Sequence, residues 1–443
     1  MWTKLLSKKR DWGNGKYEVD EKEEYYRSSF HRDYDRVIFS NSFRRLSNKT
    51  QVHPLSKNDH VHDRLTHSLE VASVGRSLGL RAGEFLKNKG EDVNPYDIAY
   101  IIQTACLAHD IGNPPFGHAG EEVIKEWFKK NEDKYFLSDL SSNEKADFHH
   151  LDGNAQSFRI VSQLENSAFE GGLRLTFSTL GTLVKYPYSS ENCESIGKSK
   201  FNFFQSEKDI FDAVFQELDL KNIDGTYRRH PLSYLMEASD DICYGLLDLQ
   251  DAFELKIIDL NDTERIFNLL CGEETTKETY HDIRMNTINK VSKLVAKSMN
   301  NLAIHVMEIF ENNYDAITLE NQPSDLLDIF TDPNLSEGIK EAKKLAREKI
   351  FNEKRKIELE LGAYNIIETL LGNLIRATYR LDTLEEGKSL SFRDRRALEL
   401  MGENRPKEAD SLYKKYQSVV DYIVGMTDNY AKYVAHQFNG MSY

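Results

Sequence analysis

Apolar side chains recur at helical spacing along most of this 443-residue chain, whereas the apolar and polar alternation of a β-strand is scarce. The pattern therefore predicts an all-α fold. Helices are predicted over residues 25–46, 65–90, 95–107, 119–130, 154–164, 231–253, 282–310, 325–330, 337–371 and 410–438. Residues 173–188 are also assigned to a helix, although the threonines there would suit a strand, and residues 189–207 are expected to form a loop.

Composition excludes several classes of protein. The hydrophobic fraction of 40% and the charged fraction of 29% are those of a globular chain and not of a disordered one. The net charge of −14 argues against a protein that coats nucleic acid by bulk charge, but a local basic patch can still grip a small polyanion. No apolar run reaches the ~18 residues of a membrane-spanning helix, and the first residues are too charged for a signal peptide. We expect a cytoplasmic protein without membrane contact, whose four scattered cysteines are reduced packing residues.

The strongest local signal is the doublet His109 and Asp110, which ends an apolar helix and is followed by the turn-forming residues 111–118 (IGNPPFGH). Burying such a doublet is costly unless both side chains find partners. A divalent cation would satisfy the neutral imidazole and the ionised carboxylate together. The alternative is an aspartate that ends the helix and pairs with a local donor.

Two further segments supply side chains of the same type. His67 lies near the start of an amphipathic helix in residues 64–70 (RLTHSLE), and two adjacent carboxylates lie within another helix in residues 237–241 (EASDD). Three separate helices could therefore converge on one ion. Two histidines and two aspartates would leave room on that ion for water or a phosphate oxygen, as a hydrolytic metal site requires.

With these residues in view, the chain resembles the HD-domain phosphohydrolases, and among them the deoxyguanosine triphosphate triphosphohydrolases. The segments that carry the resemblance are residues 43–46, 49–52, 64–71, 109–121, 152–156, 185–187, 239–244 and 421–428. Their order across nearly the whole chain is more specific than an isolated doublet. The resemblance implies an HD-domain helical fold with additional C-terminal helices. It also implies that the metal ligands are His67, His109, Asp110 and Asp240.

The simplest organisation is one predominantly helical domain without internal repeats or long linkers. Residues 1–25 are expected to form a charged N-terminal segment, residues 26–260 the HD-domain catalytic core, and residues 261–443 a C-terminal helical portion packed on that core.

The choice of Asp240 over Asp241 follows the family pattern and also helical geometry. Asp240, Tyr244 and Asp248 are four residues apart and share one helix face, whereas Asp241 is expected to point elsewhere, toward a structural partner. The resemblance places Tyr244 and Asp248 at the sugar, where an aromatic ring beside the 2′ carbon would favour deoxyribose. Without the resemblance, a tyrosine in a helix interface and a solvated aspartate explain the same residues.

His118 and Glu121 are three residues apart at the start of a predicted helix, so they also share a face. The carboxylate can orient the imidazole, which then acts as a general acid or base on the reacting phosphate. A capping interaction at the helix start is the alternative. The resemblance favours the catalytic role for both residues.

A triphosphate carries about four negative charges, so an acidic protein must gather cations locally to bind it. The candidates are Arg44, Arg45, Arg64, His150, Lys185 and Lys200. Arg64 is the best placed because it lies three residues before His67 on one helical face. Any single lysine here can instead be a solvated surface charge. The resemblance places Gln51 close to the sugar and base.

These observations predict a metal-dependent hydrolase that attacks the α-phosphorus of a deoxynucleoside triphosphate, with dGTP favoured, and releases deoxynucleoside and tripolyphosphate. Mg²⁺ or Mn²⁺ is the expected metal, and two imidazoles would also suit iron or zinc. One alternative is an HD phosphohydrolase for several dNTPs or another nucleotide. Another is a nucleotide-sensing or single-strand-DNA-binding assembly with little activity. A homo-oligomer, with a hexamer favoured, is expected from the resemblance and from the apolar residues of segment 421–438. Single-stranded DNA or a second dNTP is expected as an effector.

Overall fold

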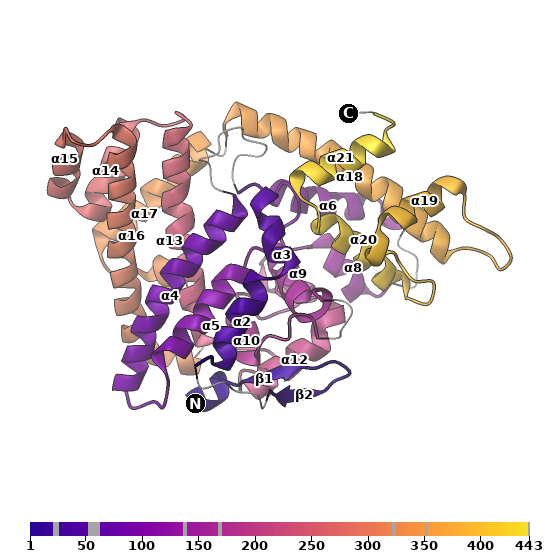
Figure 1. Cartoon of the computed structure of the whole chain (residues 1–443), viewed down its shortest axis with the longest axis horizontal. Coiled ribbons are helices and arrows are strands. Elements are labelled where there is room, and N and C mark those ends of the chain that lie inside the picture. Colours follow the sequence, from indigo (N-terminus) through magenta and orange to yellow (C-terminus); the bar gives the residue numbers. More distant parts are fainter. Residues whose placement is uncertain are drawn as a thin grey trace.

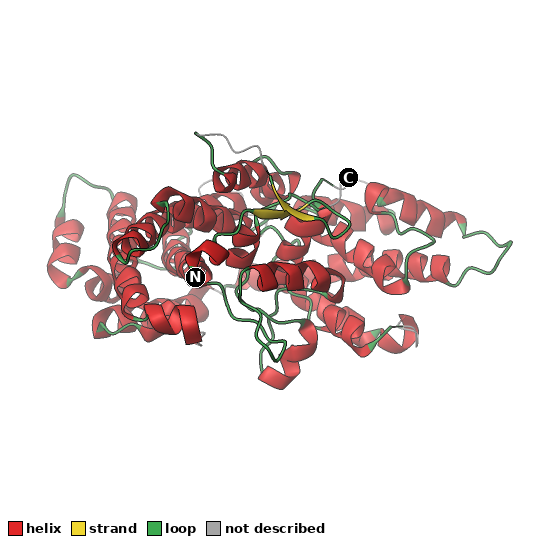
Figure 2. Cartoon of the chain, turned by 90° about the horizontal axis from the view of Figure 1, so that it is seen from below, coloured by secondary structure: helices red, strands yellow, loops and turns green. Residues whose placement is uncertain are grey.

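The computed structural model describes residues 1–20, 26–51, 63–135, 140–166, 171–320, 325–350 and 352–441. Within these residues the chain is almost entirely helical (Figure 1), which confirms the predicted all-α class. The two strands that the described residues contain, β1 (Lys9–Asp11) and β2 (Tyr17–Val19), form one short antiparallel hairpin at the periphery (Figure 2).

The first half of the chain contributes α1 (Trp2–Leu5), α2 (Ser29–Ile38), α3 (Asn41–Arg45), α4 (Arg64–Asn88), α5 (Pro95–Ala108), α6 (His118–Lys130), α7 (Glu132–Tyr135), α8 (Ser142–His149), α9 (Gly153–Arg159), α10 (Phe177–Leu183), α11 (Cys193–Ile196) and α12 (Lys208–Glu217). The second half contributes α13 (Pro231–Glu254), α14 (Leu260–Cys271), α15 (Glu273–His281), α16 (Thr287–Asn312), α17 (Pro333–Leu345), α18 (Lys354–Asp382), α19 (Phe392–Leu400), α20 (Leu412–Val424) and α21 (Asp428–Phe438).

Helices α4 and α5 share the most extensive helix–helix contact within the described residues, and local sequence signals fix where both begin. Asp63 and Thr66 form a reciprocal capping box at the start of α4. Asn94 caps α5, whose first residue is Pro95, a position where proline is favoured because its missing N–H is not needed. His67 lies on α4, and His109 directly follows the last residue of α5.

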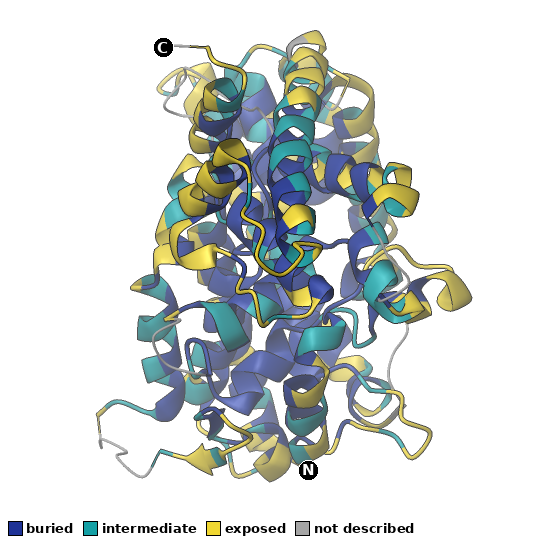
Figure 3. Cartoon of the chain, turned by 90° about the vertical axis from the view of Figure 1, so that its right-hand side faces the viewer, coloured by how far each residue is buried: buried dark blue, intermediate teal, exposed yellow. Residues whose placement is uncertain are grey.

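The buried side chains form two hydrophobic cores, which appear as the dark blue interior in Figure 3. The first core gathers around α4, α5 and α13 and includes α2, α10, α12, α14, α16 and α17. The second core joins α6 and α8 to the C-terminal helices α18, α19, α20 and α21, which lie together at the upper right of Figure 1. Side chains of residues 261–443 therefore enter both cores, and the predicted domain boundaries remain predictions.

Several predicted helices are interrupted in the structure. The helix expected over 25–46 is divided because Ser40 caps a new helix, α3, through a hydrogen bond from the N–H of Phe43. The stretch 337–371 is divided between α17 and α18, and 410–438 between α20 and α21. The expected helix 173–188 contains only the short α10, and the expected loop 189–207 includes the short α11. Helices α8, α12, α14, α15 and α19 were not predicted.

None of the helices in the described ranges is long and apolar enough to span a lipid bilayer.

The contact between α4 and α5 can be tested at a glycine. A β-carbon at Gly79 would lie 2.7 Å from Cα of Ala99, which is backbone and cannot rotate away. Gly79→Ala is therefore expected to lower the free energy of unfolding by about 1–3 kcal/mol, the usual effect of overpacking. Gly362 of α18 is the matched control, because no atom lies within 4 Å of its added β-carbon. Gly362→Ala should be neutral or stabilise by up to about 1 kcal/mol. Urea unfolding followed by circular dichroism measures both, and equal stability of the two variants would contradict this packing account.

Candidate active site

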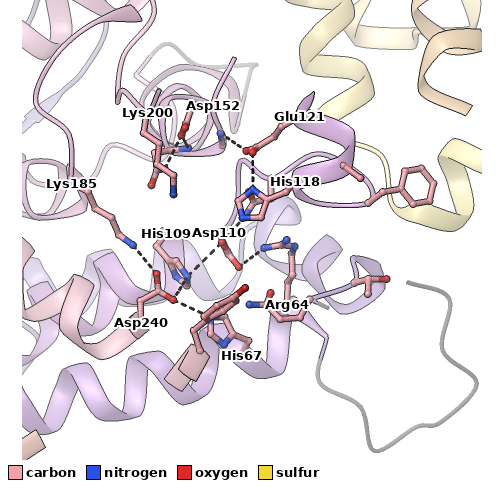
Figure 4. A pocket seen from close by; sticks show the side chains of 18 of the residues that line it. Arg64, His67, His109, Asp110, His118, Glu121, Asp152, Lys185, Lys200 and Asp240 are labelled. Atoms are coloured by element: carbon pink, nitrogen blue, oxygen red, sulfur yellow. Dashed lines mark hydrogen bonds and ion pairs between the residues drawn. The ribbon is translucent and has the colours of Figure 1, made fainter. Parts of the chain in front are cut away.

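Four side chains from separate parts of the chain converge at one point between α4, α5 and α13 (Figure 4). Nε2 of His67 lies 3.2 Å from Oδ1 of Asp240, and Nε2 of His109 lies 3.4 Å from the same oxygen. Oδ1 of Asp110 lies 3.6 Å from Nε2 of His109. Ligand atoms of His67, His109 and Asp110 all lie within 4.8 Å of one another. The structure thus brings together all four residues that the sequence predicts as metal ligands.

Three of these side chains, those of His109, Asp110 and Asp240, are oriented by a further partner. Nδ1–H of His109 donates to the carbonyl of Cys106 at 2.6 Å, so Nε2 is the ring nitrogen available to an ion. Arg64 donates to Oδ2 of Asp110 at 2.7 Å, and Nζ of Lys185 donates to Oδ2 of Asp240 at 2.7 Å. Each carboxylate therefore holds a cation on one oxygen and faces the histidines with the other.

The charges of the cluster are set by these pairs. Burial by itself would raise the pKa of Asp110, but Arg64 and then His109 hold that pKa well below its ordinary value. Burial would likewise raise the pKa of Asp240, and Lys185 with His109 keeps it well below the usual range. Two ionised carboxylates and two Nε2 atoms are a nitrogen and oxygen donor set that fits a divalent cation.

Asp241 lines the same cavity as Asp240, which corrects the expectation that it points elsewhere. Burial raises the pKa of Asp241 to about 7, and the nearby carboxylates of Asp240 and Glu237 add to the effect. Asp240 remains the better ligand candidate because it is the one that contacts His67 and His109.

A second pair of candidate residues, His118 and Glu121, lines the same cavity. His118 is the first residue of α6, and its Nδ1 lies 3.0 Å from Oε2 of Glu121, one turn along the same helix. The other oxygen of Glu121 accepts the N–H of Gly153 at 2.8 Å, which fixes the carboxylate from the side of α9. Burial would raise the pKa of Glu121, but the hydrogen bond from His118 lowers it below its ordinary value. With 76% of its side chain exposed, His118 is open to a ligand in the cavity.

A side chain at Gly153 would displace two side chains of the site. An added β-carbon would lie 2.5 Å from Oδ1 of Asn113 and 2.9 Å from Oε1 of Glu121. Asn113 in turn donates its amide N–H to Oδ1 of Asp110. The cluster of His67, His109, Asp110 and Asp240 and the His118 pair are therefore packed against the same short segment of backbone.

The cluster and the His118 pair share one cavity of about 300 Å³. Of the other residues predicted to bind substrate, Gln51, Arg64, Lys185, Lys200 and Tyr244 line it. Oε1 of Gln51 is buried and has no hydrogen-bond partner among the described residues, so it is suited to accept a hydrogen bond from a ligand.

The remaining predicted substrate residues do not line this cavity. Nε2 of His150 lies 3.9 Å from Oε1 of Glu194. Asp248 is 4% exposed and lies one helical turn beyond Tyr244. Arg44 and Arg45 are also absent from the lining, and Arg45 donates to the hydroxyl of Ser42 instead.

Sequence reasoning missed several residues of the cavity wall, notably Asp152, Glu237, Lys356 and Glu360. Glu237 carried a usable signal, because it lies three residues before Asp240 on the same helical face. Lys356 and Glu360 belong to α18, which starts a new helix after residues 351–353. The prediction treated 337–371 as one continuous helix, in which residues 356 and 360 would face a different direction than they do in the separate helix α18. The sequence pattern therefore could not indicate that they face the site.

Comparison with known proteins shows which family the chain belongs to. Residues 64–164 match the HD domain family. The whole chain is 43% identical to a "Deoxyguanosinetriphosphate triphosphohydrolase-like protein" of Pseudomonas aeruginosa, of which 99% is covered. A protein of the same name from Synechocystis sp. is 35% identical over the whole chain, with 99% of it covered. A "Deoxyguanosinetriphosphate triphosphohydrolase" of Cronobacter sakazakii is 30% identical over 91% of the chain and 92% of its own length. The chain therefore belongs to the HD-domain family of deoxyguanosinetriphosphate triphosphohydrolase-like proteins.

Proposed function

We propose that this protein is a divalent-metal-dependent dNTP triphosphohydrolase, with dGTP as the favoured substrate. The observation that carries the proposal is the shared cavity, in which the cluster of His67, His109, Asp110 and Asp240 faces the His118 and Glu121 pair. The names of the relatives support the nucleotide class, and the choice of dGTP rests on those names and on the resemblance.

The charge of the cavity wall supports the need for metal. Among the described residues, seven carboxylates and four lysine or arginine side chains line it, namely Asp110, Glu121, Asp152, Glu237, Asp240, Asp241 and Glu360 against Arg64, Lys185, Lys200 and Lys356. Arg64 and Lys185 are also already paired with Asp110 and Asp240. A triphosphate with about four negative charges would be repelled by such a wall unless divalent cations accompany it.

The four converging residues would hold the metal through Nε2 of each histidine and one oxygen of each aspartate. When bound, a divalent cation supplies charge stabilisation and lowers the pKa of a coordinated water. Arg64 and Lys185 hold the outer oxygens of Asp110 and Asp240, so they keep the inner oxygens aimed at the ion. Mg²⁺ and Mn²⁺ are the proposed metals, while the two imidazoles also suit iron or zinc.

His118 is proposed to serve as the general acid. A water oxygen forms a bond to the α-phosphorus while the bond from that phosphorus to the 5′ oxygen breaks, and Nε2–H of His118 gives its proton to the departing 5′ oxygen. The attacking water releases one proton to solvent as it becomes a phosphate oxygen, and a proton from solvent restores Nε2–H of His118. The products are deoxynucleoside and tripolyphosphate. Because Nδ1 is tied to Glu121, Nε2 is the atom that can exchange the proton.

The other lining residues suggest how the nucleotide is oriented. Lys200 is a candidate for the phosphates, and the unpaired Oε1 of Gln51 for a donor on the sugar or base. The ring of Tyr244 borders the same space. Roles for His150 and Asp248 remain predictions without support from their positions.

Oligomerisation also remains a proposal. The apolar residues that suggested it are buried in the second core, including Ile423, Met426 and Val434, so the segment packs within its own chain. Tyr430 and Tyr433 are 42% and 46% exposed. A homo-oligomer, with a hexamer favoured, and regulation by single-stranded DNA or a second dNTP therefore rest on the resemblance.

Metal content tests the ligand assignment. Asp240→Asn is expected to lose most of the bound metal, since it removes the oxygen that faces both histidines while it preserves the packing. Asp241→Asn is the matched control and should keep the metal. Inductively coupled plasma mass spectrometry after dialysis against Mn²⁺ measures metal per chain, and circular dichroism checks the fold. Metal retained in Asp240→Asn and lost in Asp241→Asn would reverse the assignment.

Metal removal tests the charge argument. After treatment with EDTA, the protein should lose both hydrolysis and measurable affinity for a non-hydrolysable dGTP analogue, because the acidic wall then repels the triphosphate. Isothermal titration calorimetry measures the affinity, and added Mn²⁺ should restore it. Unchanged affinity without metal would show that the protein side chains alone neutralise the phosphates.

Product analysis tests the reaction. Chromatography of a dNTP panel with Mn²⁺ should show deoxynucleoside and tripolyphosphate, fastest with dGTP. His118→Ala should lower kcat by about 10²–10⁴-fold, the usual contribution of a general acid, while metal stays bound. Glu121→Gln should have a smaller effect because it only loosens the imidazole. Release of dGMP and pyrophosphate would reject the proposed reaction, and full activity of His118→Ala would reject its role.

A further inference from the structure

The turn that leads into His118 has an unusual backbone. Phe116 has φ of +66° and Gly117 has φ of +58°, so two successive residues have a positive φ directly before α6. For a residue with a β-carbon this conformation costs roughly 1–2 kcal/mol. The ring of Phe116 is buried in the second core at 7% exposure. The surrounding structure must therefore hold the turn in place.

Asp428, the first residue of α21, supplies the contact that holds it. Oδ1 of Asp428 accepts the backbone N–H of Phe116 at 2.9 Å. Oδ2 accepts the backbone N–H of Thr50 at 3.1 Å and the hydroxyl of Thr50 at 2.6 Å. Asp428 is only 2% exposed, so both of its oxygens are committed to these donors. Thr50 and Phe116 line the cavity, and one carboxylate thus joins two segments of its wall.

Lys49 strengthens the same connection. Its Nζ donates to the carbonyl of Asn113 at 2.7 Å and to the carbonyl of Val424 at 2.6 Å. The start of the turn is therefore tied to the end of α20, as its later part is tied to the start of α21. Two segments far apart in sequence, 49–50 and 424–428, thus meet at this turn and hold it together with the adjoining wall.

We propose that Asp428 is a positioning residue for His118, acting through the backbone of Phe116, so that the C-terminal helices set the geometry of the general acid. The proposal rests on the proposed function for its catalytic consequence. Asp428 itself does not line the cavity and so has no contact with substrate there. A purely structural role would lower stability and leave the efficiency of the folded enzyme unchanged.

A double-mutant cycle separates these two roles. Asp428→Asn keeps the size of the side chain but turns an N–H₂ group toward one of the donors. It should lower kcat by about 10-fold or more, because small displacements of a catalytic group are costly, while KM and bound metal stay nearly unchanged. In the His118→Ala background the same substitution should lower kcat less than about twofold, since the group it positions is gone.

Asp394→Asn is the matched control. Asp394 is a buried carboxylate of α19, at 1% exposure, that accepts from Ser391 at 2.6 Å and from Arg380 of α18 at 2.7 Å, and neither partner belongs to the turn. Its substitution should lower Tm but leave kcat unchanged. If Asp428→Asn does not fold, Asp428→Glu, which keeps the charge and displaces the oxygens, takes its place.

Hydrogen exchange provides a readout that does not need activity. Exchange of the amides in residues 111–118 should be faster in Asp428→Asn than in the wild type, and unchanged in Asp394→Asn. Equal losses of kcat in the wild-type and His118→Ala backgrounds, or unchanged exchange, would overturn the proposal. A wild-type protein without dNTP hydrolysis would instead reject the proposed function, and the exchange comparison would still decide whether Asp428 holds the turn.

Discussion

The carboxylate of Asp240 is the interaction on which the rest of the site depends. Its Oδ1 faces both His67 and His109, and its Oδ2 is tied to Lys185, so one side chain links α4, the end of α5 and the segment after α10 to α13. A buried carboxylate is tolerated only when its charge is matched. The cations and imidazoles around Asp240 provide that match, and a divalent ion would complete it. The close packing of α4 on α5 then serves to hold the two histidines at a fixed separation.

The two halves of the proposed chemistry are supported by different cores. The metal cluster stands on α4, α5 and α13 of the first core, whereas His118 and Glu121 stand on α6, which belongs to the second core with α18, α20 and α21. The backbone between Asp110 and His118 is the bridge between them. Gly153, Lys49 and Asp428 contact this bridge from three sides. The relative position of the proposed ion and the proposed general acid is thus set by contacts between residues that lie far apart in the sequence, up to 312 positions for Asp428 and Phe116.

Much of this arrangement could be predicted from the sequence, and the limits have physical causes. The all-α class and the helix bounds around His67 and His109 follow from local periodicity and capping, as at Asn94 and Pro95. The cluster could be predicted because each of its residues lies on a recognisable segment. Local periodicity does not define how α18 packs, so Lys356 and Glu360 were missed. The helical spacing relates Asp248 to Tyr244, but it does not show that Asp248 is buried and does not line the cavity. The role of Asp428 depends on a tertiary contact with Phe116 that no local pattern reveals.

The central claim is that water attacks the α-phosphorus of a dNTP held between the metal cluster and His118. The most direct measurement is a single turnover of dGTP with Mn²⁺ in water enriched in oxygen-18, followed by mass spectrometry of both products. The account predicts that the label enters a terminal phosphate of the tripolyphosphate and that deoxyguanosine carries none. Label in the 5′ hydroxyl of deoxyguanosine, or in a nucleoside monophosphate, would contradict it.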